Sequence, residues 1–328
     1  MTENLPLAKA INLGLAKALA DDPKVLLMGE DIGKLGGVFR VTDGLQKDFG
    51  EARVIDSPLA ESGIVGTAVG LAMRGFRPVV EIQFDGFVFP AFDQIVTQVA
   101  KHNARSAGRT PMPITIRIPY GGGIGAVEHH SESPEAYFAH TAGLRVLSPS
   151  NPLDAFVMVQ QAIAHPDPVI FFEPKRRYWD KAEIDESLDL ASAPSPFTAR
   201  VVRPGSSITV ACYGPMVRTC LEAATAAAGD GVDIEVVDLR TISPLDVDTV
   251  ATSVRRTGRL VVVHEAPVFL GLGAELAARI TEECFYSLEA PVIRVGGYHT
   301  PYPPSRLEED YLPDLDRVLD GVDRAMAF

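Results

Sequence analysis

Short apolar runs rich in β-branched residues recur along the chain and alternate with stretches of helical periodicity. Runs without polar alternation are typical of parallel strands that are buried on both faces. They predict strands at residues 25–28, 78–84, 113–118, 169–172, 208–212, 234–239, 260–263 and 292–295. The periodic stretches predict helices at residues 7–19, 64–73 and 217–228. This alternation indicates an α/β fold with parallel sheets covered by helices.

A change in composition divides the chain into two parts. Residues 183–190 are acidic, and residues 191–197 are rich in Ala, Ser and Pro, which is typical of a linker. We therefore expect a first α/β domain over residues 1–185, a linker over 186–203 and a second α/β domain over 204–328. A chain of 328 residues is long enough for two cores.

Composition excludes several classes of function. The net charge of -13 argues against a nucleic-acid surface, because phosphate binding needs clustered Lys and Arg. Cys212, Cys220 and Cys284 form no CxxC pair, which disfavours zinc ribbons and a disulfide framework and fits a cytoplasmic location. The first residues lack the basic region of a signal peptide. The apolar segment 63–73 is well short of the roughly 20 residues that a membrane span needs.

Two glutamates in the first domain are candidates for chemistry. Glu30 follows the predicted strand 25–28, at the carboxyl end where α/β sheets bind ligands, although a solvated turn explains it equally well. Glu61 precedes the apolar helix 64–73. A buried glutamate costs free energy unless it has a partner, which favours a role in proton chemistry. The alternative is an ordinary acidic residue at a helix N-terminus.

A glycine-rich segment, residues 121–125, precedes the adjacent residues His129 and His130. The glycines predict a flexible loop over a site, and no Gly-Lys-Ser/Thr follows them, so this is no Walker motif. A histidine beside such a loop suits proton transfer near neutral pH. A plain surface histidine is the alternative, and a zinc site is disfavoured because the HExxH pattern is absent.

Longer motifs resemble the β subunits of 2-oxoacid dehydrogenase decarboxylase components, in the transketolase-like group. The N-terminal blocks are residues 29–31, 36–40 and 56–63, and the resemblance covers essentially the whole chain. Residues 81–84, 89–95, 130–136, 171–175, 283–285, 288–291 and 297–301 are most similar to the branched-chain type. Pyruvate and acetoin relatives share several of these motifs. The resemblance implies a transketolase-like pyrimidine-binding domain followed by a transketolase C-terminal domain.

The resemblance also implies roles for individual residues. Glu61 matches the glutamate that hydrogen-bonds the aminopyrimidine of thiamine diphosphate. His130 matches the histidine that donates a proton during acyl transfer to lipoamide, with His129 as the alternative. The cofactor-binding residues would be Glu30, Leu59, Glu61, Gln83 and Phe87. Some relatives hold a structural potassium with backbone carbonyls, and the matching positions are Ile114, Thr115, Ala162, His165 and Asp167.

The magnesium-binding half of such a site is missing from the sequence. Gly229-Asp230-Gly231 matches the start of the thiamine-diphosphate signature, but no Asn occurs after Asn151, so we predict a tight turn there. We therefore expect a second chain to hold magnesium. The resemblance implies that this partner is an α subunit, in an α2β2 heterotetramer, and that a lipoyl-bearing dihydrolipoyl acyltransferase is a further partner. The expected substrate is a 2-oxoacid such as 3-methyl-2-oxobutanoate.

The sequence disfavours two other functions. A nicotinamide dehydrogenase is disfavoured because Gly271-Leu272-Gly273 lacks the third glycine and the acidic residue of a dinucleotide fingerprint. A non-catalytic assembly subunit is disfavoured because Glu61 and His130 are both present.

Overall fold

A seven-stranded sheet forms the centre of the first domain. The computed structural model describes residues 2–188 and 190–328 of the chain. The strands lie in the order β12 (Thr241–Ser243), β6 (Arg145–Leu147), β7 (Val169–Pro174), β5 (Thr115–Tyr120), β4 (Arg77–Glu81), β2 (Val25–Gly29) and β3 (Val54–Asp56). All neighbours pair in parallel except β12, which is antiparallel to β6. The central strands are buried along their length, as their continuous apolar sequences predict.

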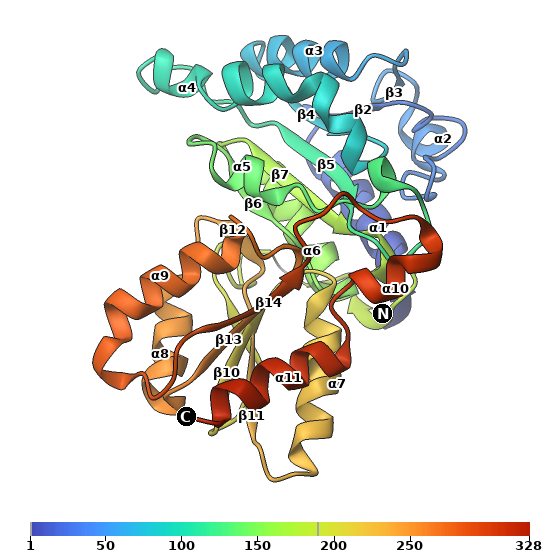
Figure 1. Cartoon of the computed structure of the whole chain (residues 1–328). Helices are drawn as coiled ribbons and strands as arrows, with labels where there is room; N and C mark the ends of the chain where they lie inside the picture. The colour runs from blue at the N-terminus through green and yellow to red at the C-terminus, as the bar shows by residue number, and fades with distance from the viewer. Residues whose placement is uncertain (1, 189) are drawn as a thin grey trace.

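Helices cover both faces of this sheet. On one face α1 (Leu7–Asp21) packs against α6 (Pro152–Ala164), and their apolar residues form one core with those of the strands. The other face is covered by α3 (Glu61–Met73) and the π-helix η2 (Gln94–Val99). Figure 1 shows α3 at the upper edge of the molecule and the second domain at the opposite end.

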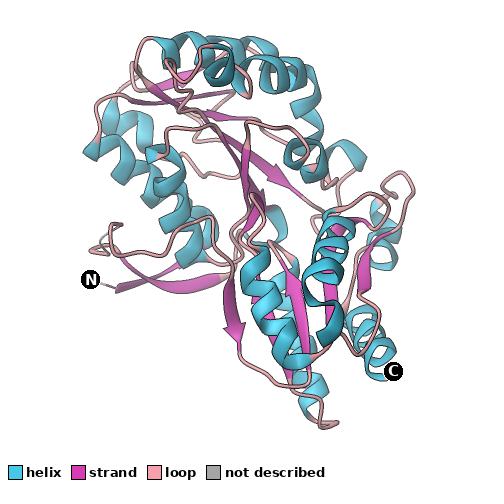
Figure 2. Cartoon of the chain, turned by 90° about the vertical axis from the view of Figure 1, so that its left-hand side faces the viewer, coloured by secondary structure: helices cyan, strands magenta, loops and turns pink. Residues whose placement is uncertain are grey.

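A five-stranded sheet forms the second domain. Its order is β14 (Ile293–Gly297), β13 (Leu260–Pro267), β10 (Ile208–Cys212), β11 (Ile234–Asp238) and β9 (Arg200–Arg203). Helices α7 (Met216–Ala228) and α11 (Leu315–Met326) cover one face. The opposite face carries α8 (Val247–Thr257) and α9 (Leu272–Cys284) and belongs to the same core as α3. Figure 2 shows these helices on either side of the strands. The two domains therefore share one continuous apolar interior.

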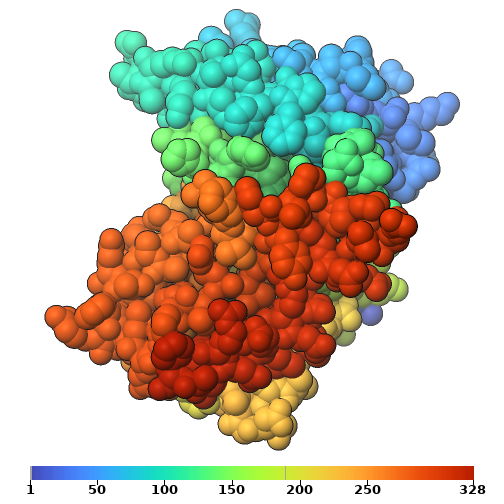
Figure 3. Space-filling model, viewed as in Figure 1, coloured from blue at the N-terminus to red at the C-terminus, as the bar shows by residue number. Residues whose placement is uncertain are grey.

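Short elements complete the chain and lie mostly at the edges of the sheets. The helices are α2 (Leu45–Phe49), α4 (His102–Arg105), α5 (Glu135–Ala139) and α10 (Glu308–Tyr311). The 3-10 turns are η1 (Asp85–Ala91), η3 (Glu128–His130), η4 (Lys175–Arg177), η5 (Phe285–Ser287) and η6 (Ser305–Leu307). The segment between β14 and α11, which contains α10, reaches the first domain (Figures 1 and 3). Space-filling atoms of this segment lie directly against residues of the first domain in Figure 3.

Three features depart from the purely parallel sheets that the sequence predicts. Strand β9 lies inside the predicted linker 186–203 and pairs antiparallel with β11. Strand β12 leaves the second half of the chain to join the first sheet. A further antiparallel pair joins β1 (Thr2–Pro6) to β8 (Lys181–Asp185). These strands are short or partly exposed edge strands with polar residues, so the apolar-run criterion does not detect them.

Three further predictions from the sequence concern membrane helices, the cysteines and the turn at residues 229–231. No helix within the described residues is long and apolar enough to cross a membrane. Cys212, Cys220 and Cys284 are buried thiols without disulfide bonds. Gly229-Asp230-Gly231 forms a turn directly after α7, in which Gly231 has φ +82°, so the predicted tight turn is confirmed.

Candidate active site

The end of β2 and the start of α3 bring Glu30 and Glu61 together. Both side chains are only 8% exposed. The loop between β3 and α3 is held against β2 by a hydrogen bond of 2.8 Å from the Ser57 N–H to the Gly29 carbonyl. Burial and the charge of Glu61 raise the pKa of Glu30, and a backbone hydrogen bond from Ala60 opposes this shift. Glu30 therefore holds a proton at higher pH than an ordinary glutamate does.

One oxygen of this acidic pair has no partner. Oε1 of Glu30 is buried and accepts no hydrogen bond from any residue in the described parts of the chain. Nearby, the Gln83 side-chain amide donates to the Glu30 carbonyl at 3.3 Å. Leu59, just before α3, is 82% exposed. Glu30, Glu61, Gln83 and Leu59 thus lie near the end of β2 and the start of α3. Oε1 of Glu30 is an acceptor there for a hydrogen-bond donor on a ligand.

The His130 ring lies among aromatic rings that follow β4. It stacks on Phe84 with 4.0 Å between ring centroids, and it meets Phe87 in an edge-to-face arrangement with 5.1 Å between centroids. The ring is half-buried, and its Nδ1 has no hydrogen-bond partner within residues 2–188 and 190–328. His129 is exposed, and its Nδ1 lies 3.6 Å from Glu128 Oε1. Of the two histidines, His130 has the ring that is packed between aromatic neighbours.

The elements that carry the acidic pair and the histidine are connected by contacts through η1. Helix α3, which begins with Glu61, packs against η1, which contains Phe87. In turn η1 packs against η3, which ends with His130. The backbones approach so closely that a Cβ placed on Gly86 would lie 2.4 Å from the His129 carbonyl oxygen. These contacts fix the site residues on rigid neighbouring elements, although they come from four separate parts of the sequence.

Comparisons with known proteins show the family to which the chain belongs. The model of the transketolase pyrimidine-binding domain matches residues 3–180, and that of the transketolase C-terminal domain matches residues 198–318. The pyruvate dehydrogenase E1 component subunit beta of Leifsonia xyli subsp. xyli is 59% identical over 99% of this chain and 96% of its own length. The 3-methyl-2-oxobutanoate dehydrogenase subunit beta of Mycobacterium tuberculosis is 54% identical over 99% and 93%. The chain belongs to the 2-oxoacid dehydrogenase E1 β subunits.

Other relatives extend the comparison. The 2-oxoisovalerate dehydrogenase subunit beta of Pseudomonas aeruginosa is 43% identical over 98% of this E1 β chain and 95% of its own length. A solved structure, a split-gene transketolase described as an inactive beta4 tetramer, has a TM-score of 0.79 at 22% identity over 99% of both chains. At that identity the likeness shows a shared fold. The predicted transketolase-like fold and the family are therefore confirmed.

The E1 β family uses thiamine diphosphate, and the site residues fit that cofactor on its pyrimidine side. The unpaired Glu30 oxygen, the buried Glu61 carboxylate beside it and the unpaired Nδ1 of His130 are polar atoms of the kind that a bound ligand satisfies. Among the described residues, no three or more His, Cys, Asp or Glu side chains lie together as a metal site.

Three of the five carbonyls predicted to bind potassium, those of Ile114, Ala162 and His165, have hydrogen-bond partners. The Ile114 carbonyl accepts from the Val169 N–H at 2.9 Å, and the Ala162 carbonyl accepts from the His165 N–H at 3.2 Å. The Arg77 guanidinium donates to the carbonyls at the end of α6, including that of His165 at 3.4 Å. A positive charge thus faces the His165 carbonyl, and a cation there would share this acceptor with Arg77. Potassium at Ile114, Thr115, Ala162, His165 and Asp167 stays a prediction.

Sequence reasoning missed the charged residues that surround the His130 backbone. Lys175, at the end of β7, forms a buried ion pair with Asp85 and donates to the His130 carbonyl at 2.6 Å. Burial raises the pKa of Asp85 and lowers that of Lys175, and the contact between them opposes both shifts. Asp85 also accepts from the Glu132 N–H at 2.8 Å. The sequence does show that Asp85 and Lys175 follow predicted buried strands. It does not show that they pair with each other, because they are 90 residues apart.

Proposed function

We propose that this chain supplies the pyrimidine-binding half of the active site of a branched-chain 2-oxoacid dehydrogenase. The observation that carries the proposal is the buried pair Glu30 and Glu61, with one unpaired oxygen, on elements connected through η1 to the turn that carries His130. When bound, thiamine diphosphate supplies the electron sink for decarboxylation. In this proposal Glu61 hydrogen-bonds the aminopyrimidine ring, and Glu30 holds a proton close to it.

The surrounding residues orient the cofactor and the transferred acyl group. Leu59 and Phe87 provide apolar contacts for the pyrimidine, and Gln83 holds the Glu30 backbone. His130, held on Phe84, donates a proton through its unpaired nitrogen as the acyl group passes to a lipoyl group. The lipoyl group belongs to a dihydrolipoyl acyltransferase, which is the proposed second partner.

The other half of the site belongs, in this proposal, to an α subunit. The sequence has no Asn downstream of Gly229-Asp230-Gly231 that completes a magnesium site. A diphosphate needs a metal to balance its charge, so a second chain must bring both magnesium and its ligands. An 82% exposed Leu59 beside the acidic pair agrees with a pocket that a partner completes, because isolated Leu side chains seldom line an open site.

Pyruvate is the second candidate substrate. The 59% identical relative is named a pyruvate dehydrogenase subunit, whereas the 54% and 43% identical relatives are named for 3-methyl-2-oxobutanoate and 2-oxoisovalerate. The motifs at residues 81–84 and 130–136 favour the branched-chain type. Substrates that differ by a methylene are separated by only about 1–3 kcal/mol, so a direct comparison is needed.

The test is a substrate panel on the complex reconstituted with an α subunit. We expect a higher kcat/KM for 3-methyl-2-oxobutanoate than for pyruvate; the opposite order would assign the chain to pyruvate. Glu61→Gln keeps the shape of the side chain and should abolish decarboxylation of every substrate. Glu51→Gln, an exposed change of the same kind, should leave it unaltered. Turnover by Glu61→Gln at the wild-type rate would refute the assigned role.

A further inference from the structure

The segment from Gly121 to Glu132 is a closed loop that carries His130. Its two ends are joined by a hydrogen bond of 2.9 Å from the Gly121 N–H to the Glu132 carbonyl. Apart from the turn η3, the loop has no helix or strand. It is thus an Ω-loop, whose backbone groups need partners outside regular secondary structure.

Two carboxylates of the second domain provide those partners. Glu265, at the end of β13, accepts from the Gly122 N–H at 2.5 Å. Glu308, the first residue of α10, accepts from the Gly123 N–H with one oxygen and from the Gly125 N–H with the other, both at 2.9 Å. Both glutamates are buried. Hydrogen bonds from N–H groups to a carboxylate are about twice as strong as neutral ones, so this is a firm attachment.

The glycines are required at this attachment. Gly123 and Gly125 have φ of +86° and +70°, where other residues are strained. A Cβ on Gly122 would lie 1.9 Å from the Tyr302 hydroxyl oxygen. That hydroxyl donates to Glu308 at 2.8 Å and so orients the carboxylate. The glycines therefore allow the loop backbone to contact the second domain closely, and they do not make the loop mobile.

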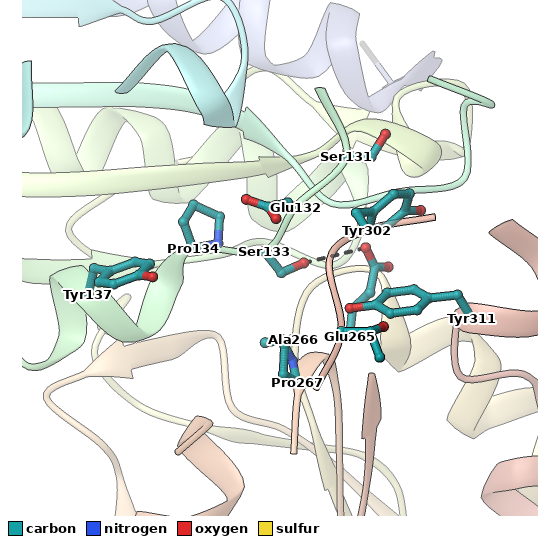
Figure 4. A pocket seen from close by; sticks show the side chains of 11 residues that line it. Ser131, Glu132, Ser133, Pro134, Tyr137, Glu265, Ala266, Pro267, Tyr302 and Tyr311 are labelled. Carbon is teal, nitrogen blue, oxygen red and sulfur yellow. Dashed lines mark hydrogen bonds between the residues drawn. The ribbon is translucent and has the colours of Figure 1, made fainter. Parts of the chain in front are cut away.

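The close-up of the boundary between the domains shows how these groups meet. Glu265 and Tyr302 of the second domain lie near the end of the loop, and Ser133, directly after the loop, donates to Glu265 at 3.4 Å (Figure 4). A cavity of about 120 Å³ lies at this boundary. On the other side of the loop, Lys175 holds the His130 carbonyl, and the Val127 carbonyl accepts from the His130 N–H at 3.0 Å. The first domain thus holds the His130 backbone directly, and the second domain holds the loop through the amides of its glycines.

We propose that Glu308 is a positioning residue for His130, acting through the two glycine amides. The proposal rests on the proposed function, in which His130 donates a proton during acyl transfer. Glutamine in place of Glu308 has one acceptor oxygen instead of two. One glycine amide would then face an NH2 group, and the loop would lose its fixed place relative to Phe84. Acyl transfer should suffer from this displacement more than decarboxylation does, because only transfer uses His130.

The experiment compares Glu308→Gln with Glu309→Gln in the reconstituted complex. Glu309 is the exposed neighbour and loses the same charge. For Glu308→Gln we expect faster hydrogen exchange in peptides spanning residues 121–132, with exchange in β13 unchanged. We also expect about a 10-fold loss in overall transfer to lipoamide, equivalent to about 1.4 kcal/mol. The fold-loss in decarboxylation, measured with an artificial electron acceptor, should be less than half of the fold-loss in transfer. Glu309→Gln should behave as wild type in all three measurements.

A second variant keeps the test decisive if Glu308→Gln does not fold. Gly125→Ala has space for its methyl group, 3.9 Å from the Ser305 Cβ, but strains the loop at a positive φ. It should give the same selective loss of transfer with Glu308 intact. The proposal would be overturned if hydrogen exchange in residues 121–132 were unchanged in these variants. Equal losses in transfer and decarboxylation would also overturn it. If the wild-type complex turns over no 2-oxoacid, the proposed function fails, while the exchange data still decide whether Glu308 holds the loop.

Discussion

Replacing Lys175 by Met should destabilise the protein strongly at neutral pH. Lys175 and Asp85 are both fully buried, and Lys175 Nζ also holds the His130 carbonyl and lies 5.5 Å from the centre of the Phe84 ring. Methionine has a similar volume, so the main effect is an uncompensated carboxylate. Breaking a buried ion pair in this way costs about 3–5 kcal/mol.

The loss should depend on pH in a defined direction. Burial raises the pKa of Asp85, and without Lys175 nothing of comparable strength opposes that shift. A carboxyl whose folded pKa is raised contributes most to stability below its unfolded pKa of about 3.9, and this contribution is lost as pH rises through the folded pKa. Lys175→Met should therefore lose less stability, relative to wild type, at pH 5 than at pH 8.

Thermal unfolding at both pH values measures the effect. Asp85→Asn combined with Lys175→Met removes both charges and should recover most of the loss at pH 8. Lys47→Met, at an exposed position of α2, controls for the loss of a lysine. A double variant as unstable as the single one, or a loss that is the same at pH 5 and pH 8, would refute the reasoning.

Two further predictions concern His130 and a buried acid between the domains. His130→Ala should reduce transfer to lipoamide more than decarboxylation with an artificial acceptor, because its unpaired nitrogen is assigned to the transfer step; no loss in either assay would turn attention to His129. Burial raises the pKa of Glu135 to about 7, so wild-type stability should fall as pH rises from 4.5 to 7. Glu135→Gln removes this dependence and should gain up to about 3 kcal/mol on wild type between pH 4.5 and pH 8, measured by denaturant unfolding. A constant difference between the two proteins across that range would contradict the raised pKa.

The sequence predicts the central strands well because burial on both faces leaves a continuous apolar run. Strand β10 begins and ends where the run at residues 208–212 predicts, and β2, β7 and β11 differ by at most two residues at either end. Strand β12 was not predicted, because three residues of mixed polarity carry no such signal. Its pairing with β6, across the domain boundary, depends on tertiary packing alone.

The site was predictable where a residue type matched a known motif. Glu61 and His130 were predicted in this way. The structure places Glu61 beside Glu30, whose buried Oε1 is unpaired, and leaves Nδ1 of His130 unpaired. The charged residues around the loop were not found, because their function depends on which backbone groups they reach. Glu308 holds amides about 180 residues earlier in the chain, a distance that no local pattern encodes.

The helix after the histidines shows how a tertiary contact can override a local sequence pattern. Ser133 and Pro134 suggest a capped helix start, but α5 begins at Glu135 without a side-chain cap. The Ser133 hydroxyl instead donates to Glu265 across the domain boundary. A tertiary partner thus replaced the local hydrogen bond that the sequence favours.

Cofactor binding by the separated chain tests the divided site most directly. Isothermal titration calorimetry with thiamine diphosphate and magnesium should show little or no heat of binding for this chain alone. After an α subunit is added, binding should become tight, and Glu61→Gln should weaken it. Tight binding of thiamine diphosphate to the isolated chain, together with decarboxylation of 2-oxoacids in the absence of an α subunit, would contradict the account.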